Sequence, residues 1–322
     1  MILGKINELN FEISDCKIFY DFIKADNHTT HNVEKKQIDE FNMLKESTNW
    51  KHMYHNGNSV PRLITQQYLP AEHYLPNEQY LTNELYEPNK QYLPIYRHPV
   101  DYQLPHEPFD EFTKQLAEQI EEKLNLPYKL NHVLIQQYRS GSDFIGEHAD
   151  KTLDIKPNTS IINYTLGATR YLHLKSKQNK SYGQYVALKN NSLFILGLDT
   201  NKHFYHAIKP DKRPNGEKSN DEKSFDGVRI SYTFRCINTF LRLTPPTKEP
   251  TYDLIREEPT HDLIREEPTY DLIGQGAPTY DLTDKNDYKK MIDAFGIENY
   301  DYNFHWNTHY GNGFFALDTS EK

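Results

Sequence analysis

The chain has 322 residues, of which 36% are hydrophobic and 26% charged, and its formal net charge is −9. This length allows one large or two modest domains, and the low apolar fraction indicates that part of the chain lies outside any packed core. With two cysteines, Cys16 and Cys236, a disulfide framework is excluded, which favours a reducing compartment, the nucleus and/or the cytoplasm. We expect no signal peptide, and the longest apolar run, 192–198, is too short to cross a membrane.

The charge is distributed unevenly along the chain. Residues 129–242 carry 18 Lys and Arg against 10 Asp and Glu, a net charge of +8. The flanks are acidic, with 12 basic against 20 acidic residues in 1–128 and 7 against 16 in 243–322. A solvated lysine-rich surface between acidic tails would explain this pattern. A middle domain that meets an anion, such as nucleic acid or a dicarboxylate cosubstrate, would explain it equally.

Two segments of the chain are repetitive. Residues 66–94 place a tyrosine at every sixth position from Tyr68 to Tyr92, and 250–282 repeat a Pro-Thr-(Tyr/His)-Asp-Leu unit every nine or ten residues. Neither period matches a helix face or a strand face, and each unit is too short to bury a core. We interpret both as low-complexity, mostly disordered insertions, with partner docking through the Tyr-Leu-Pro units as the alternative.

Between the repeats, the pattern becomes that of a globular domain. Residues 110–125 put apolar side chains on one helical stripe and acidic residues at its start, which predicts an amphipathic helix. A second helical pattern covers 284–296. Short β-type runs lie at 131–138, 160–167, 170–175, 192–197, 204–209 and 228–235. Several short strands accompanied by one or two helices predict a β-sandwich or barrel with helices packed outside.

One cluster of residue types suggests a metal site. His148 and Asp150 are two residues apart, so on an extended segment their side chains point the same way. His206 follows downstream, and two histidines with one carboxylate form the facial triad typical of non-haem Fe(II) oxygenases. His203 is the rival for the distal position, but on a strand an odd separation turns it away from His206. A His-x-Asp match alone has little weight in a chain with 15 histidines.

The strand predicted at 228–235 adds a second signal. Its alternation puts Arg229, Ser231 and Arg235 on one face and apolar residues on the other. An arginine inside a barrel is unfavourable unless it meets an anion, and two of them match the two carboxylates of 2-oxoglutarate. Exposed arginines on an edge strand are the alternative. Gln136 and Tyr138 form a further polar pair on the strand before His148.

The segments YRSGSDFIGEHADKTLD (138–154), SIINYTLGATR (160–170) and VRISYTFR (228–235) together resemble the AlkB-like Fe(II)/2-oxoglutarate-dependent dioxygenases. A fungal-type branch of that family is similar over further segments, namely 50–67, 95–105, 130–141, 273–278 and 294–315. The resemblance implies an α+β fold with a double-stranded β-helix (jelly-roll) core and flanking helices, interrupted by the low-complexity repeat insertions.

The resemblance also implies the domain organisation. We expect an N-terminal segment at 1–44 and a dioxygenase domain at 45–245 that contains the repeat insertion at 66–94. A second repeat insertion would occupy 246–272, and a C-terminal helical extension of the domain would occupy 273–322.

The roles of the site residues come from the same resemblance. It assigns Fe(II) to His148, Asp150 and His206, with 2-oxoglutarate and O₂ as cosubstrates. The cosubstrate would be held by Gln136, Tyr138, Arg229, Ser231 and Arg235, with Arg229 at the distal carboxylate and Arg235 nearer the metal. Arg62 and Lys151 are candidates for the substrate pocket. Lys151 departs from the nucleic-acid-repair members, which tend to carry an acidic residue there that contacts the damaged base.

The function this implies is oxidative demethylation of alkylated nucleic-acid bases, in DNA repair or RNA demethylation, with the basic segment 129–242 meeting the nucleic acid. Lys151 leaves open the same iron chemistry on a protein or a small molecule. A non-catalytic interaction protein whose repeats recruit partners is a third alternative, and the complete set of metal ligands argues against it. We expect no membrane association.

Overall fold

The computed structural model describes residues 15–23, 30–55, 58–69, 91–97, 106–213, 223–243, 270–273, 280–281, 285–311 and 314–315. Most of the two predicted repeat insertions, 66–94 and 246–272, and most of the segment 273–278 lie outside these residues. The division of the chain into domains therefore stays a prediction.

Eight consecutive strands form the centre of the fold. They are β6 (His132–Tyr138), β7 (Ile145–His148), β8 (Ser160–Gly167), β9 (Arg170–Ser176), β10 (Gly183–Leu188), β11 (Ser192–Gly197), β12 (Phe204–Ile208) and β13 (Arg229–Arg235). One sheet contains them in the order β11-β8-β13-β6, and the other in the order β10-β9-β12-β7. The chain thus crosses repeatedly between two antiparallel sheets, which is the winding of a jelly roll. The predicted fold class is confirmed.

Further strands extend this framework. In the larger sheet, β1 (Lys17–Phe19) pairs with β11, while β3 (Asn58–Tyr68), β2 (Lys51–His55) and β5 (His106–Pro108) continue it beyond β6. A separate three-stranded sheet joins β4 (Gln91–Pro94), β14 (Phe240–Leu243) and β15 (Tyr270–Ile273). A short parallel pair joins β16 (Tyr280–Asp281) to β17 (Phe314–Phe315). Sequence patterns did not predict β2, β3 or β10.

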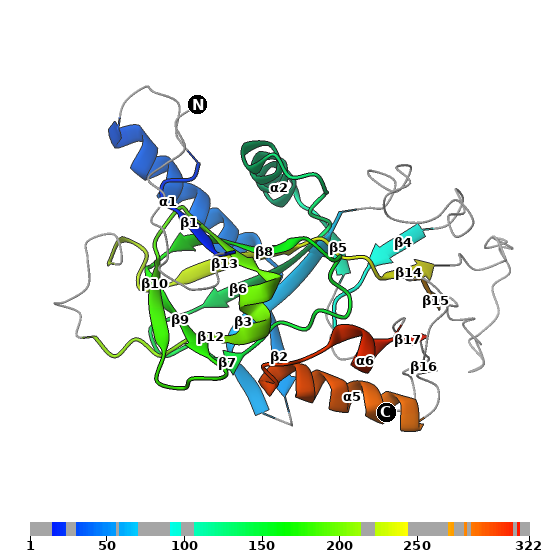
Figure 1. The fold of residues 1–322 in the computed structure, drawn as a ribbon. Helices are drawn as coiled ribbons and strands as arrows, with labels where there is room; N and C mark the ends of the chain where they lie inside the picture. The colour runs from blue at the N-terminus through cyan, green and yellow to red at the C-terminus, as the bar shows by residue number, and fades with distance from the viewer. Residues whose placement is uncertain are drawn as a thin grey trace, which may run out of the picture.

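Two helices cover the outer face of the larger sheet, α1 (Thr30–Ser47) and α2 (Glu111–Leu124) (Figure 1). Helix α2 begins where Asp110 accepts a hydrogen bond from the Thr113 backbone N–H (2.7 Å), and it ends at Asn125 in the left-handed conformation. Its residues Leu116 and Ile120 pack with the outward-facing side chains of the sheet in one apolar cluster. The predicted amphipathic helix is confirmed.

The two sheets enclose a second apolar cluster, contributed mainly by β9, β10, β11 and β12. Strand β13 separates the two clusters as its alternation predicts. Its residues Ile230, Tyr232 and Phe234 belong to the cluster under the helices. Its polar residues therefore face the space between the sheets.

A glycine is required at the turn between β8 and β9. Gly167 has a φ of +91°, and a Cβ there would lie 2.4 Å from the carbonyl oxygen of Val228. After this turn, β9 lies in the other sheet, where it pairs with β12.

Three more helices complete the described structure: α3 (Leu198–His203), α5 (Lys285–Tyr300) and α6 (Trp306–Tyr310). Helix α5 confirms the second predicted helical pattern. It lies beneath the sheets with one end near β2, and α6 packs beside it (Figure 1). Among the described residues, no helix is both long enough and apolar enough to span a bilayer.

Candidate metal centre

A cavity of about 690 Å³ opens between the two sheets and reaches helix α5. All ten residues that the sequence nominated for the site line it: Arg62, Gln136, Tyr138, His148, Asp150, Lys151, His206, Arg229, Ser231 and Arg235. These residues come from separate segments of the chain, from β3 to β13, which the fold brings together. The volume lies in the range usual for small-molecule sites.

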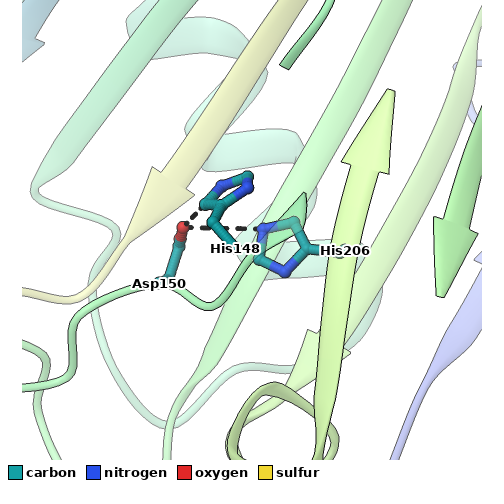
Figure 2. A group of neighbouring side chains, drawn as sticks. All are labelled: His148, Asp150 and His206. Atoms are coloured by element: carbon teal, nitrogen blue, oxygen red, sulfur yellow. Dashed lines mark ion pairs between the residues drawn. The ribbon is translucent and has the colours of Figure 1, made fainter. Parts of the chain in front are cut away.

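The three predicted metal ligands lie together (Figure 2). His148 and His206 are directly paired on adjacent strands β7 and β12. The Oδ1 atom of Asp150 is 3.6 Å from the Nε2 atom of each imidazole. One donor atom from each residue lies within 4.8 Å of the other two, which is the spacing that a common metal ion requires.

The carboxylate of Asp150 is held on its far side by an arginine. Arg235 donates from Nη2 (2.5 Å) and Nε (3.2 Å) to Oδ2, which leaves Oδ1 directed at the two imidazoles. Burial alone would raise the pKa of Asp150, but Arg235 and the two histidines hold this pKa well below its ordinary value. Asn201 also fixes the backbone of Asp150, accepting from its N–H (2.8 Å) and donating to its carbonyl (2.9 Å).

The two histidines are also arranged to bind a metal ion. His148 donates from Nδ1 to the carbonyl oxygen of Gly146 (2.8 Å), so its Nε2 lone pair faces Asp150. Burial and the nearby His206 lower the pKa of His148 to about 3, so this imidazole is neutral. Two imidazoles and one carboxylate are the donor set of a non-haem Fe(II) site, and the residues present fit that ion.

The rival histidine lies elsewhere, but the strand argument against it was wrong. His203 is the last residue of helix α3, not a strand residue. Its Nδ1 donates to the carbonyl of Asp199 (2.8 Å), and its ring contacts Tyr302 with the ring centroids 4.5 Å apart. His203 therefore does not join the His148–Asp150–His206 cluster.

Arg229 lies deeper in the cavity, on the same face of β13 as Arg235. Its side chain is 1% exposed, and Nη2 donates to Asn163 Oδ1 (3.0 Å) and Thr165 Oγ1 (2.9 Å). Its Nε has no hydrogen-bond partner among the described residues. A buried guanidinium with neutral partners and an unused N–H is suited to bind a carboxylate of 2-oxoglutarate.

The remaining predicted cosubstrate residues surround Arg229. The ring of Tyr138 lies 5.2 Å from the guanidinium carbon of Arg229, and its hydroxyl donates to Gln136 Oε1 (3.3 Å). Ser231 accepts from Asn163 Nδ2 (2.7 Å). Register explains this grouping, because Arg229 pairs with Tyr138 and Ser231 pairs with Gln136 across β13 and β6.

The two substrate-pocket candidates line the same cavity as helix α5. Arg62, on β3, donates from Nη1 to the carbonyl of Phe144 (3.2 Å). The Nζ atom of Lys151 is buried without a hydrogen-bond partner among the described residues, and burial lowers its pKa to about 8. The sequence therefore nominated residues from both ends of one cavity.

Several residues of the site escaped sequence analysis. Asn163 and Thr165 hold Arg229, Asn201 holds Asp150, and Asn299 of α5 accepts from the N–H of Ala149. A signal for Asn163 and Thr165 existed, since two polar residues two positions apart lie on one face of the strand 160–167. Asn201 and Asn299 had none, because helical polar residues are common at exposed positions.

These features define an iron- and 2-oxoglutarate-dependent oxygenase fold, and the sequence agrees. The profile of the 2OG-Fe(II) oxygenase superfamily matches residues 24–235, about two thirds of the chain. The protein belongs to that superfamily, whose members use Fe(II), 2-oxoglutarate and O₂.

Individual relatives match over shorter stretches. The human protein named DNA oxidative demethylase ALKBH2 is 36% identical over 86 residues, which is 24% of this chain and 33% of that protein. The cattle protein of the same name is 27% identical over 130 residues, 38% of this chain and 40% of its own length. This chain thus spans about a third to two fifths of these relatives. The solved structure "The structure of OsALKBH1" is 15% identical, with a TM-score of 0.45, over 72% of this chain and 99% of that one.

Proposed function

We propose that this protein is an AlkB-type Fe(II)/2-oxoglutarate-dependent dioxygenase that demethylates alkylated nucleic-acid bases. The observation that carries the proposal is the single cavity in which the His148–Asp150–His206 cluster and the buried Arg229 meet. The superfamily match and the relatives named as DNA oxidative demethylases support it.

When bound, Fe(II) couples the oxidation of 2-oxoglutarate by O₂, which yields succinate and CO₂, to hydroxylation of a substrate C–H bond. The chain provides the geometry for this chemistry. Arg235 keeps Asp150 ionised and oriented, the Gly146 carbonyl fixes His148, and Arg229 binds one end of the cosubstrate. Apolar walls from β9 and β11, including Leu172, exclude water from that end.

On an N-methylated base, hydroxylation of the methyl group gives an unstable hydroxymethyl adduct. That adduct loses formaldehyde and leaves the base unmethylated. The net positive segment 129–242, which contains the site, favours a polyanionic substrate. A target base would have to leave its stack to enter the cavity, as in other enzymes that modify bases. We propose the nucleus or the cytoplasm as its location, since such substrates occur there.

The test is formaldehyde release from methylated single-stranded oligonucleotides in the presence of Fe(II) and 2-oxoglutarate. Formation of one formaldehyde for each methyl group removed supports the proposal. Succinate formation without any change in the oligonucleotides would contradict the proposed nucleic-acid substrate, but it would still support the Fe(II)/2-oxoglutarate chemistry.

The buried cation at Lys151 favours a second candidate, the same oxidation of a neutral or anionic group in a protein or a small molecule. A panel of methylated peptides and metabolites, assayed by succinate release above the unstimulated rate, separates the two candidates. Stimulation by a peptide or metabolite, with oligonucleotides inert, would favour the second.

A further inference from the structure

Helix α5 forms one wall of the cavity, although it lies outside the residues that the superfamily profile matches. It contributes Tyr288, Ile292, Phe295, Gly296 and Asn299. The spacing of these positions places them on one helical face. The neighbouring face carries Met291 and Ala294, which pack with α6 in an apolar cluster that Phe295 also joins.

This wall is tied directly to the loop that carries the metal ligand Asp150. Asn299 Oδ1 accepts from the N–H of Ala149 (2.9 Å), and Glu298 accepts from both the N–H (2.9 Å) and the hydroxyl of Thr152. Tyr310 of α6 donates to the other oxygen of Glu298 (2.6 Å). Helix α5 is therefore fixed against the metal centre by hydrogen bonds on either side of Asp150.

Cationic side chains from outside β13 also line the cavity, namely Arg62 from β3, Arg97 and Lys151. Of the described residues that line the cavity, Asp150 is the one acid, and it is paired with Arg235. The Nζ atom of Lys151 is buried with no hydrogen-bond partner among the described residues, although the nearby carboxylate of Glu298 opposes the lowering of its pKa by burial.

We propose that the space between the apolar face of α5 and the cations Arg62 and Lys151 is the substrate subsite, and that it binds a flat, uncharged, carbonyl-bearing methylated base in preference to a cationic one. Ile292 and Phe295 contact the ring face, and a ring carbonyl accepts from the Lys151 ammonium. A cationic ring is repelled by the same ammonium. This inference rests on the proposed function and specifies which bases it concerns.

Gly296 provides a way to fill the subsite. It is helical, and a Cβ built there meets only the ring of Tyr300, at 4.0 Å, which is an ordinary contact distance. A larger side chain at this position therefore projects beside the cavity without forcing the backbone. Asp293, exposed on the same helix and absent from the cavity lining, is the matched control position.

The test compares kcat/KM of the full-length protein on single-stranded oligonucleotides that contain one N3-methylthymine, which is neutral, or one N1-methyladenine, which is cationic. We expect the native protein to favour N3-methylthymine at least tenfold, and Lys151→Met to lower that ratio at least tenfold. Arg62→Met, on another wall, should lower it in the same direction. Gly296→Leu should reduce kcat/KM on N3-methylthymine tenfold or more, with Asp293→Leu at the native value.

Preference of the native protein for N1-methyladenine, or a ratio unchanged in both Lys151→Met and Arg62→Met, would overturn the inference while leaving the proposed function intact. A parallel loss of 2-oxoglutarate affinity in Gly296→Leu, measured by calorimetry, would overturn the role of α5, because the helix would then be only structural. Absence of formaldehyde from every oligonucleotide, with succinate still formed, would instead overturn the proposed function itself.

Discussion

The two ends of the cavity are built from different kinds of structure. At the inner end, Arg229 and its partners lie on β6, β8 and β13, and strand register brings them together. At the outer end, α5 meets the loop after β7 through residues 150 positions apart in the chain, Ala149 and Asn299. The difference teaches that the inner end is fixed by the sheets, whereas the outer end depends on a helix that can change without altering them. We therefore expect cosubstrate binding to depend on the inner end and substrate choice on the outer end.

The largest effect is expected from a variant that removes a ligand of the metal centre, which lies between the two ends. His206→Ala should abolish detectable 2-oxoglutarate turnover and weaken Fe(II) binding in an anaerobic titration, because it removes one of three ligands. His203→Ala is the control, since His203 is hydrogen-bonded within α3. If His203→Ala lost iron and His206→Ala kept it, the assignment of the distal ligand would be wrong.

The inner end is tested by comparing two buried arginines. Arg229→Ala should raise the KM for 2-oxoglutarate about a hundredfold or more, because losing one partner of a buried charged pair costs about 3–5 kcal/mol. Arg170 instead donates to three backbone carbonyls, those of Ser140, Asp143 and Lys209. Arg170→Ala should therefore lower Tm with little change in this KM. Equal loss of soluble protein in both variants would indicate that both arginines are structural.

At the outer end, a smaller effect is expected from the anchor of α5. Asn299→Leu leaves the N–H of Ala149 without its acceptor, at a cost of about 1–3 kcal/mol, and should weaken Fe(II) binding about tenfold by loosening the loop at Asp150. Asn299→Asp retains an acceptor oxygen and should restore most of the affinity. Tyr300→Ala, at an exposed neighbour that is absent from the cavity lining, serves as the control. Native affinity in Asn299→Leu would show that α5 does not position the metal ligand.

The smallest effect is expected from the predicted repeat insertion. Deleting residues 250–268 should leave Fe(II)-dependent turnover within about twofold of native, because loop-closure entropy changes slowly with length. The deletion ends just before β15, which pairs with β14. Loss of turnover in a folded deletion variant would mean that this segment contributes to the outer end.

Much of the inner end could be predicted from the sequence because strands repeat every two residues. That period assigned the opposite faces of β13. It also predicted that His148 and Asp150 converge, which they do although β7 ends at His148 and Asp150 lies in the loop after it. The same rule failed for His203, because the chain turns into a short helix before β12 and strand parity does not apply there. A strand or helix period therefore predicts where a side chain points only when the type of element that contains the residue is known.

The outer end could be predicted only in part. The helix at 284–296 was evident from its periodicity, but its position against the loop at 149–152 was not, because a helical pattern does not specify what its apolar face packs against. Lys151 was singled out by its place beside Asp150, while only the fold shows that its Nζ has no hydrogen-bond partner among the described residues. The sequences of helix α1 and of strands β3 and β10 lack a clear hydrophobic period. The two strands are stabilised by pairing with neighbouring strands, and α1 by packing against the sheet.

The central claim is that the His148–Asp150–His206 cluster and Arg229 form a working Fe(II)/2-oxoglutarate centre. The most direct measurement is Fe(II)-dependent conversion of 2-oxoglutarate to succinate, followed side by side for the native protein and Asp150→Ala, with folding checked by circular dichroism. The account predicts succinate from the native protein and none above background from a folded Asp150→Ala variant. Equal succinate formation by both, or none from a native protein that binds Fe(II) and 2-oxoglutarate, would contradict it.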